Sequence, residues 1–151
     1  MDPSRRLMKE FQNILKDPPP GITASPTEGN IFEWNAVIVG VDETLWEDAV
    51  LKVKMKYPKD YPAHPPFCTF ITKVFHPNVF PTTQEICLDI LRRNWSPAYN
   101  VSAILLSIQQ LLTEPNPAAN ANPEACQLYI HNRSEYEHRV RQCVEDSWAQ
   151  D

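Results

Sequence analysis

The stretch LKVKMKY, residues 51–57, alternates strictly between apolar and lysine side chains. Its apolar members are Leu51, Val53, Met55 and Tyr57, and its charged members are Lys52, Lys54 and Lys56. Successive side chains of a β-strand point to opposite faces, so this pattern predicts a strand with one buried and one wet face. Such a strand is typical of an antiparallel sheet that packs on a core with one face only.

Further strand signals lie on both sides of this stretch. Residues 31–39, IFEWNAVIV, are rich in aromatic and β-branched side chains and predict a second strand. Residues 67–72, FCTFIT, predict a shorter third one, and a weaker fourth signal lies at Ile22–Ser25. An antiparallel sheet near the N-terminal half of the chain is therefore expected.

The chain begins with a helical pattern. Leu7, Met8, Phe11, Ile14 and Leu15 follow helical spacing and predict an amphipathic helix over 3–16, which three consecutive prolines then stop. The opposite face carries the basic side chains Arg5, Arg6, Lys9 and Lys16. A basic face of this kind is either solvated surface or a docking face for an acidic partner, and the pattern favours neither.

In the second half of the chain, apolar residues recur with the spacing of helices. VSAILLSIQQLL, residues 101–112, is apolar almost all round and predicts a buried helix. Residues 123–131 and 134–148 predict two more, the second with Ser134 as N-cap and Glu137 at the third helical position. Strands followed by helices, without alternation, indicate an α+β fold.

Composition sets further limits. A length of 151 residues suits one domain, 1–151, and a net charge of −5 argues against a protein that binds nucleic acid by neutralising phosphates. No apolar run is long enough to span a membrane, and the start of the chain lacks a signal peptide, so cytoplasm and nucleus are the expected locations. The four cysteines are too widely spaced for a zinc signature, and we expect free thiols and no metal.

The chemistry is expected in the irregular middle of the chain, where KVFHPNVFPTTQEICLDIL spans residues 73–91. It places Cys87 eleven positions after His76. A histidine in His-Pro-Asn is more often a turn-former than a base, and no glycine flanks Cys87 to build an exposed nucleophile turn. The pattern therefore disfavours a cysteine hydrolase.

A cysteine that only carries an activated acyl group needs no paired base. A free thiol is a few per cent thiolate at neutral pH and is intrinsically nucleophilic. When an amine attacks the resulting thioester, an oxyanion forms, and one neutral donor aimed at it is worth about 10²–10³ in rate. Asn78 is a candidate for that donor. From the residues alone, a buried structural role for Cys87 is as well supported as a catalytic one.

Several short motifs follow one another along the chain: HPN at 76–78, ICLDIL at 86–91 and WSP at 95–97, with DPPPG at 17–21, WNAVIVG at 34–40, YPKDYPAHPP at 57–66 and LLTEPNP at 111–117. Together they resemble the ubiquitin-conjugating enzyme family. The resemblance runs through essentially the whole chain in order. RRLM at 5–8, VSAILLSIQ at 101–109 and the C-terminal region are most similar to the branch linked to DNA-damage tolerance and histone ubiquitination.

The resemblance implies the UBC fold: an N-terminal helix, a four-stranded antiparallel meander, an active-site loop and C-terminal helices. It also implies that Cys87 accepts ubiquitin as a thioester from the activating enzyme and passes it, with a ligase, to a substrate lysine. Asn78 matches the oxyanion donor, and His76 with Pro77 matches structural positions of the site. ATP is consumed by the activating enzyme, so no cofactor is expected here.

Partner contacts follow from the same resemblance. Arg5, Arg6 and Lys9 match a helix face that docks the activating enzyme. The residues matching two loops that meet a RING-type ligase are Ala63, His64, Ser96, Pro97 and Ala98. The implied partners are ubiquitin, the activating enzyme, the ligase and the substrate protein, with neither nucleic acid nor membrane, and the expected state is a monomer.

The sequence departs from the family pattern at three places. Thr83-Gln84-Glu85-Ile86 stands where a glycine is common, in a loop one residue longer than in the favoured branch, which keeps the peroxisomal branch open. Ala49 replaces a frequent hairpin glycine. Ala119 stands about where many members carry an acidic or hydroxyl residue that prepares the incoming lysine, so slow, ligase-dependent transfer is expected.

Two alternatives to ubiquitin transfer remain compatible with these motifs. A catalytically silent binding module would keep the fold without using the thiol. An enzyme for another ubiquitin-like modifier would keep the chemistry and change the cargo.

Overall fold

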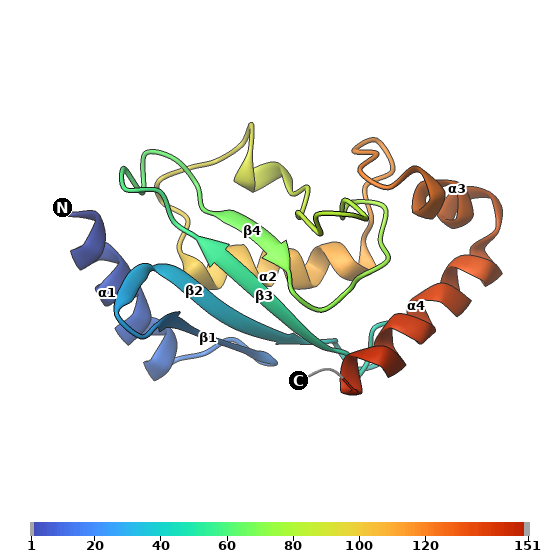
Figure 1. Ribbon diagram of the computed structural model, residues 1–151, viewed down its shortest axis with the longest axis horizontal. Coiled ribbons are helices and arrows are strands. Elements are labelled where there is room, and N and C mark those ends of the chain that lie inside the picture. Colours follow the sequence, from blue (N-terminus) through green and yellow to red (C-terminus); the bar gives the residue numbers. More distant parts are fainter. Residues whose placement is uncertain (1, 150–151) are drawn as a thin grey trace.

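The computed structural model describes residues 2–149. An N-terminal helix is followed by an antiparallel sheet, a long irregular segment and three helices (Figure 1). The elements are α1 (Pro3–Lys16), β1 (Ile22–Thr27), β2 (Asn30–Val39), β3 (Val50–Lys56), β4 (Phe67–Phe70), the short 3-10 helix η1 (Asp89–Leu91), α2 (Val101–Thr113), α3 (Pro123–His131) and α4 (Arg133–Trp148). This order confirms the predicted α+β class and the four-stranded meander.

The sheet has the strand order β1-β2-β3-β4 with every neighbouring pair antiparallel. Trp34 of β2 stands opposite Met55 of β3, and Val53 of β3 stands opposite Phe70 of β4. Leu51, Val53 and Met55 are fully buried while the lysines between them reach solvent. The alternation in LKVKMKY therefore corresponds to one buried and one solvent-facing side of the strand, as predicted. Strand β4 is shorter than the strand predicted over 67–72 and ends at Phe70.

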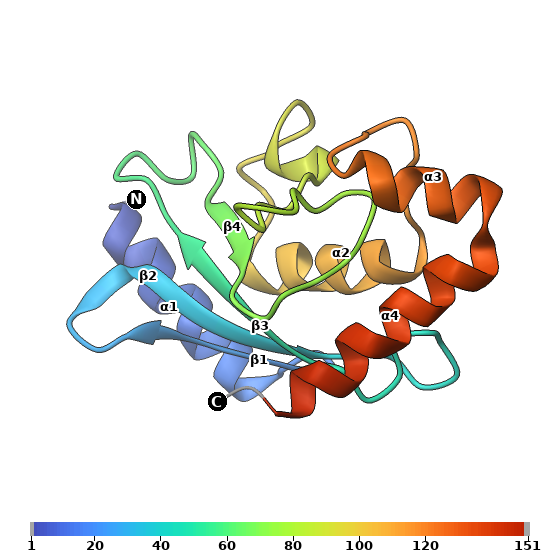
Figure 2. The same ribbon diagram turned by 45° about the vertical axis from the view of Figure 1, so that its right-hand side comes forward.

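Helix α2 covers the inner face of the sheet (Figure 2). Its buried side chains Ile104, Leu105 and Ile108 join Trp34 and Leu51 of the sheet in one hydrophobic core. The helix is not buried all round, because Leu106 is 42% exposed on its outer side. Burying such a helix face stabilises the folded state by roughly 1.5–3 kcal/mol for each large aliphatic side chain. Helix α2 is therefore a stable support for the segments that pack on it.

Helix α1 buries Leu7 and Ile14 and packs Phe11 against the core, as predicted, but its buried face is shifted toward Glu10. Met8 and Leu15 are 46% and 64% exposed, whereas Glu10 is only 8% exposed beside the buried Leu7 and Ile14. The Glu10 carboxylate accepts hydrogen bonds from Tyr61 Oη at 2.6 Å and from the backbone N–H of Val101 at 2.8 Å. A buried carboxylate is tolerated only when its oxygens are satisfied, and these partners satisfy one oxygen each.

Helices α3 and α4 follow one another with a single residue between them. Asn132 separates them and its side chain accepts a hydrogen bond from the backbone N–H of Glu135 at 3.3 Å. The predicted N-cap at Ser134 is therefore wrong, since Ser134 already lies inside α4. Tyr136, Val140 and Val144 of α4 complete the core at this end of the molecule.

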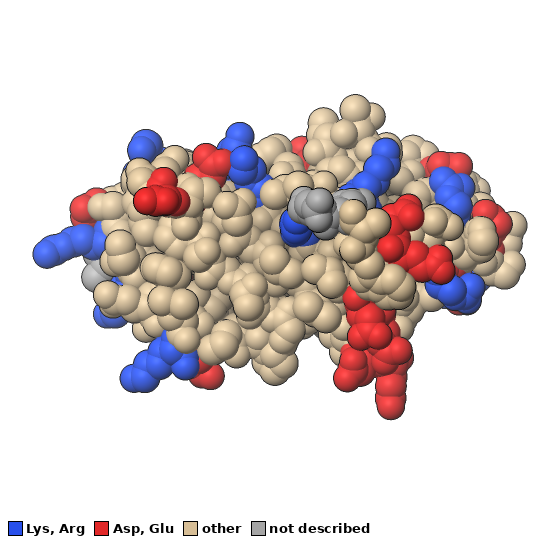
Figure 3. Space-filling view, turned by 60° about the horizontal axis from the view of Figure 1, so that its bottom comes forward, with Lys and Arg blue, Asp and Glu red and all other residues tan. Residues whose placement is uncertain are grey.

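Charged groups are unevenly spread over the surface. Figure 3 shows a broad face with few charged side chains in its middle, basic ones mostly at its edge, and an acidic cluster that projects at the lower right. No described helix is both long and apolar enough to cross a membrane.

Candidate active site

The irregular segment between β4 and α2 forms the candidate site. Figures 1 and 2 both place it between β4 and α3, above α2. Two isolated β-bridges, Thr69 with Glu85 and Val79 with Ile86, fasten the segment to the edge of the sheet and to itself. Its position is therefore set by β4, which the core holds in turn.

The His-Pro-Asn turn begins the loop. His76 is fully buried, and its Nδ1 accepts the backbone N–H of Asn78 at 2.9 Å while its Nε2 donates to the carbonyl of Leu111 in α2 at 2.8 Å. Burial lowers the pKa of His76 to about 4, so the ring is neutral at pH 7. Both ring nitrogens are engaged, which leaves none to act as a base and supports the turn-former interpretation.

The loop then returns on itself to present the thiol. Phe80 N–H donates to the carbonyl of Glu85 at 3.0 Å, and Cys87 N–H donates to the carbonyl of Asn78 at 2.8 Å. Cys87 is therefore tied directly to the His-Pro-Asn turn. Its side chain is only partly buried, whereas the thiols of Cys68 and Cys126 are buried.

Gln84 lies in the run 83–86, which stands where the resembled family commonly has a glycine. Its φ is +61°, a left-handed conformation that costs a non-glycine residue roughly 1–2 kcal/mol. Its side chain is buried: Oε1 accepts the N–H of Val74 at 2.7 Å, and Nε2 donates to the carbonyls of Val74 and Pro81 at 3.3 and 3.2 Å. The departure from glycine thus places an amide that cross-links the loop.

Asn78 connects the loop to the segment that precedes α3. Its Nδ2 donates to the carbonyls of Asn116 and Ala119 at 2.8 and 2.7 Å, and its Oδ1 accepts the N–H of Asn116 at 2.8 Å. Both amide hydrogens are therefore bonded within the protein. Pro77 is buried, and its carbonyl accepts N–H groups of Ala121 and Asn122 at 3.1 Å.

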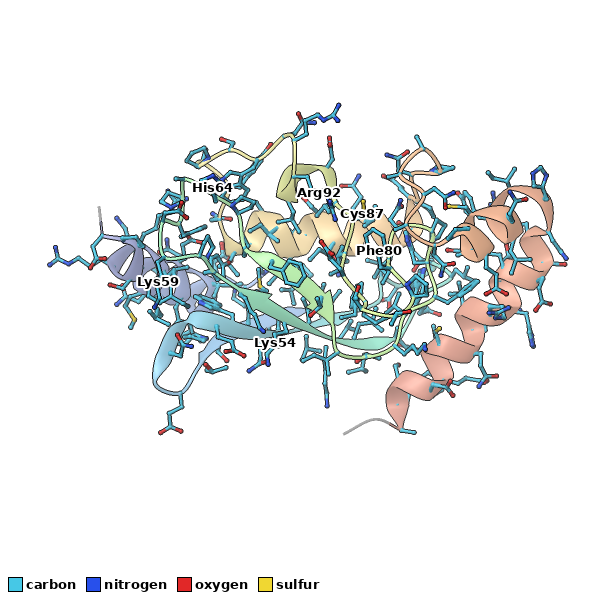
Figure 4. All side chains as sticks on the ribbon, turned by 45° about the horizontal axis from the view of Figure 1, so that its top comes forward. Lys54, Lys59, His64, Phe80, Cys87 and Arg92 are labelled. Carbon is cyan, nitrogen blue, oxygen red and sulfur yellow. The ribbon has the colours of Figure 1, made fainter. Side chains whose placement is uncertain are left out.

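A groove of about 600 Å³ lies beside Cys87. Its lining residues are Cys87, Leu88, Asp89, Arg92, Arg93, Leu111, Asn116, Ala118 and Ala119. Arg92 is held by an ion pair to Glu85 with 2.9 Å between Nη2 and Oε2, and Figure 4 shows it next to Cys87. Ala119, singled out as a departure, does border the thiol's groove.

The remaining predicted site residues lie elsewhere. Arg5 and Lys9 are exposed on α1, while the Arg6 guanidinium is bound to Glu10 and to the carbonyls of Pro97 and Tyr99 at 2.5 and 2.9 Å. Ala63 and His64 are exposed, with His64 Nδ1 2.6 Å from Asp60 Oδ2. The last three, Ser96, Pro97 and Ala98, lie on the loop before α2.

Sequence reasoning missed one feature of the site. Arg92 and Arg93 line the groove directly after the ICLDIL motif, and that adjacency was the available signal. Away from the groove, it also missed Glu10, which joins α1 to α2 and has the sequence appearance of one more charged surface residue. Within residues 2–149, no three His, Cys, Asp or Glu side chains are grouped so that they could hold a metal ion.

Comparison with known proteins agrees with this geometry. Residues 6–144 match the family model described as ubiquitin-conjugating enzyme. The chain is 53% identical over 144 residues to "Ubiquitin-conjugating enzyme E2 1" of Caenorhabditis elegans, a match that covers 95% of this chain and 74% of that protein. It is 50% identical over 144 residues to "Ubiquitin-conjugating enzyme E2 2" of Neurospora crassa, with 95% of each covered. The chain belongs to the ubiquitin-conjugating enzyme family, transferases that form a thioester intermediate and act with ubiquitin, an activating enzyme and a ligase.

Proposed function

We propose that Cys87 is the thiol that carries ubiquitin. The observation that supports this is its partly buried side chain on a groove of about 600 Å³, which no other cysteine of the described chain lines. The Cys87 sulfur attacks the thioester carbon that joins ubiquitin to the activating enzyme. A new C–S bond forms, the old one breaks, and the activating enzyme's thiol leaves with the proton.

Transfer to a substrate follows in the same groove. The lysine Nζ attacks the thioester carbon, the C–S bond to Cys87 breaks, the amine proton is lost and an isopeptide bond remains. Asn78 is proposed as the donor to the oxyanion. Since its Nδ2 is bonded to the carbonyls of Asn116 and Ala119, one of those bonds must be released when the oxyanion forms.

A charging assay tests the role of Cys87. The protein is mixed with ubiquitin, a ubiquitin-activating enzyme and ATP, and then run on non-reducing and reducing gels. We expect an adduct that reductant removes, that Cys87→Ala abolishes and that Cys143→Ala leaves unchanged. An adduct that persists in Cys87→Ala would contradict the assignment. No adduct in the folded wild type would favour the silent binding module, and charging by another modifier's activating enzyme would favour the changed cargo.

Arg5, Arg6 and Lys9 are proposed to dock the activating enzyme. Ala63, His64 and the loop of Ser96, Pro97 and Ala98 are proposed to meet a RING-type ligase. The two loops are neighbours, because Trp95 Nε1 donates to the carbonyl of Pro62 at 2.9 Å.

These contacts can be separated by rate measurements. Lys9→Glu is expected to slow charging and leave free-lysine discharge unchanged. His64→Glu is expected to leave charging unchanged and to reduce ligase-stimulated discharge.

The finer assignment rests on the flanking motifs. We propose that residues 1–151 form one UBC domain of the DNA-damage-tolerance and histone-ubiquitination branch, acting as a monomer in cytoplasm and nucleus. RRLM at 5–8 and VSAILLSIQ at 101–109 support the branch, while the longer loop before Cys87 is also compatible with the peroxisomal one. Ubiquitination of a histone in a reconstituted assay would support the branch, and sedimentation at micromolar concentration would test the monomer.

A further inference from the structure

Lysine is confined to the first half of this chain. The lysines are Lys9, Lys16, Lys52, Lys54, Lys56, Lys59 and Lys73. The segment 74–151, which contains Cys87, has no lysine, and its basic residues are Arg92, Arg93, Arg133, Arg139 and Arg141. The part of the chain that builds the active-site groove and the helices after it therefore carries positive charge without a primary amine.

That distinction matters beside a thioester. A neutral amine attacks a thioester carbon, and a lysine with a pKa of about 10.4 always has a small neutral fraction. An amine held on the same molecule gains an effective concentration that reaches roughly 10⁵–10⁸ M in well-oriented cases, which outweighs its protonation. A guanidinium stays protonated in proteins and does not attack a thioester. Lysine and arginine at the groove therefore carry the same charge, but only lysine could receive ubiquitin.

The structure places arginines at the Cys87 groove, where the difference in reactivity between lysine and arginine toward a thioester matters most. Arg92 and Arg93 are the two basic residues that line the Cys87 groove, and both are exposed. Figure 4 shows Arg92 beside Cys87, with Lys54 and Lys59 well away from the thiol. Lys73, the lysine next to the lysine-free segment, lines a different cavity of about 350 Å³ together with Cys143.

We propose that Arg92 and Arg93 determine which amine accepts ubiquitin, because they give the groove positive charge without a primary amine. The enzyme charged with ubiquitin then does not transfer it to itself in cis. The inference rests on the thioester at Cys87 proposed above. The reaction that is prevented is attack by a lysine Nζ of this chain on the thioester carbon, with cleavage of the C–S bond, return of the Cys87 thiol and formation of an isopeptide bond. No oxidant or further reactant takes part.

Conservative substitutions test the proposal. Arg92→Lys, Arg93→Lys and the double variant keep the charge and add an amine, and Arg141→Lys on α4 is the matched control because its exposed side chain does not line the groove. Each protein is charged with ubiquitin, ATP is then removed, and the thioester is followed without ligase or added lysine. Charging itself shows that each variant is folded.

We expect the wild type and Arg141→Lys to lose the thioester by hydrolysis. The groove variants should form a reductant-resistant adduct at least about tenfold faster. That rate should rise with pH and stay the same on dilution, as required for attack in cis, and peptide mapping should find ubiquitin at the substituted position.

Two results would overturn the inference. One is a reductant-resistant adduct in the wild type that forms independently of dilution and as fast as in the variants. The other is adduct formation in the double variant within twofold of Arg141→Lys. Failure of Cys87 to charge in any of the proteins is distinguishable from both, because it would refute the proposed function first.

Discussion

The side-chain amide of Gln84 pairs with the backbone of Val74 in both directions. Val74 N–H donates to Gln84 Oε1 at 2.7 Å, and Gln84 Nε2 donates back to the Val74 carbonyl at 3.3 Å. Both residues are buried, so the pair substitutes for hydrogen bonds to water that the backbone of Val74 loses on folding. This pair joins the start of the active-site segment to the residues just before Cys87.

We predict that replacing Gln84 lowers stability in a defined order. Gln84→Gly relieves the left-handed strain of roughly 1–2 kcal/mol but leaves the Val74 N–H unsatisfied, which costs about 1–3 kcal/mol besides the lost hydrogen bonds. Gln84→Ala loses the same bonds and keeps most of the strain. Urea unfolding should therefore rank the wild type above glycine and glycine above alanine.

The glycine and alanine variants serve as controls for each other. Their difference measures the left-handed strain of about 1–2 kcal/mol less the roughly 0.5–1 kcal/mol of extra chain entropy that glycine loses on folding. A glycine variant as stable as the wild type would mean that the buried amide contributes nothing beyond offsetting its own strain.

A second prediction concerns the acid sensitivity that His76 confers. Burial lowers the pKa of His76 to about 4, against about 6.5 for an exposed histidine. Between these values the unfolded chain binds a proton that the folded chain does not, so stability falls as pH drops from about 6.5 to 4. The loss should approach roughly 3 kcal/mol at the lower end.

Unfolding curves of wild type and His76→Gln between pH 4 and 7.5 measure this slope. Glutamine does not titrate, so the variant should start less stable and lose less on acidification. Parallel curves for the two proteins would contradict the neutral, buried state of His76.

Much of the fold follows from local pattern. LKVKMKY and the helices over 3–16 and 101–112 were predictable because burial imposes periods of two and 3.6 directly on the sequence. The burial of Glu10 on α1 was not, because its partners Tyr61 and Val101 lie 51 and 91 residues away in the sequence. The cap of α4 is Asn132 instead of the predicted Ser134, and asparagine and serine are about equally favourable at this position.

The sequence indicated candidate residues for the site but not how they are hydrogen-bonded. HPN and ICLDIL point to Cys87 and Asn78 as candidates, but the contact of Asn78 with Asn116 and Ala119 depends on how distant segments pack. Gln84 was visible only as a missing glycine. Its φ of +61° and buried amide belong to the folded loop and leave no periodic trace in the sequence.

The four thiols should differ sharply in reactivity, which is the third prediction. Burial raises the pKa of Cys68 to about 12 and also raises the pKa of Cys126 and Cys143, which lowers their thiolate fractions. With limiting iodoacetamide at pH 7.5, mass spectrometry should find Cys87 alkylated first and Cys68 last. Alkylation of Cys143 before Cys87 would contradict the exposure of the candidate nucleophile.

The fourth prediction separates two roles of Asn78. If its amide stabilises the oxyanion, Asn78→Ala should slow single-turnover discharge to free lysine by about 10²-fold. The variant should also lose stability, because Asn116 and Ala119 lose their side-chain partner. Comparing discharge with urea unfolding distinguishes the roles: lower stability with a lysine rate within twofold of wild type would leave only the loop-bracing role.

The last prediction concerns Ala119, which borders the Cys87 groove. The ammonium group of a lysine must lose a proton before it can attack the thioester. Residues 118–123, AANANP, contain no acidic side chain that could assist this proton loss. Ala119→Asp places a carboxylate there and should speed discharge to free lysine by about tenfold at pH 7. Ala119→Asn is the matched control, because it has the same shape without the charge. An equal rate in the two variants would show that the missing carboxylate is not what limits transfer to free lysine.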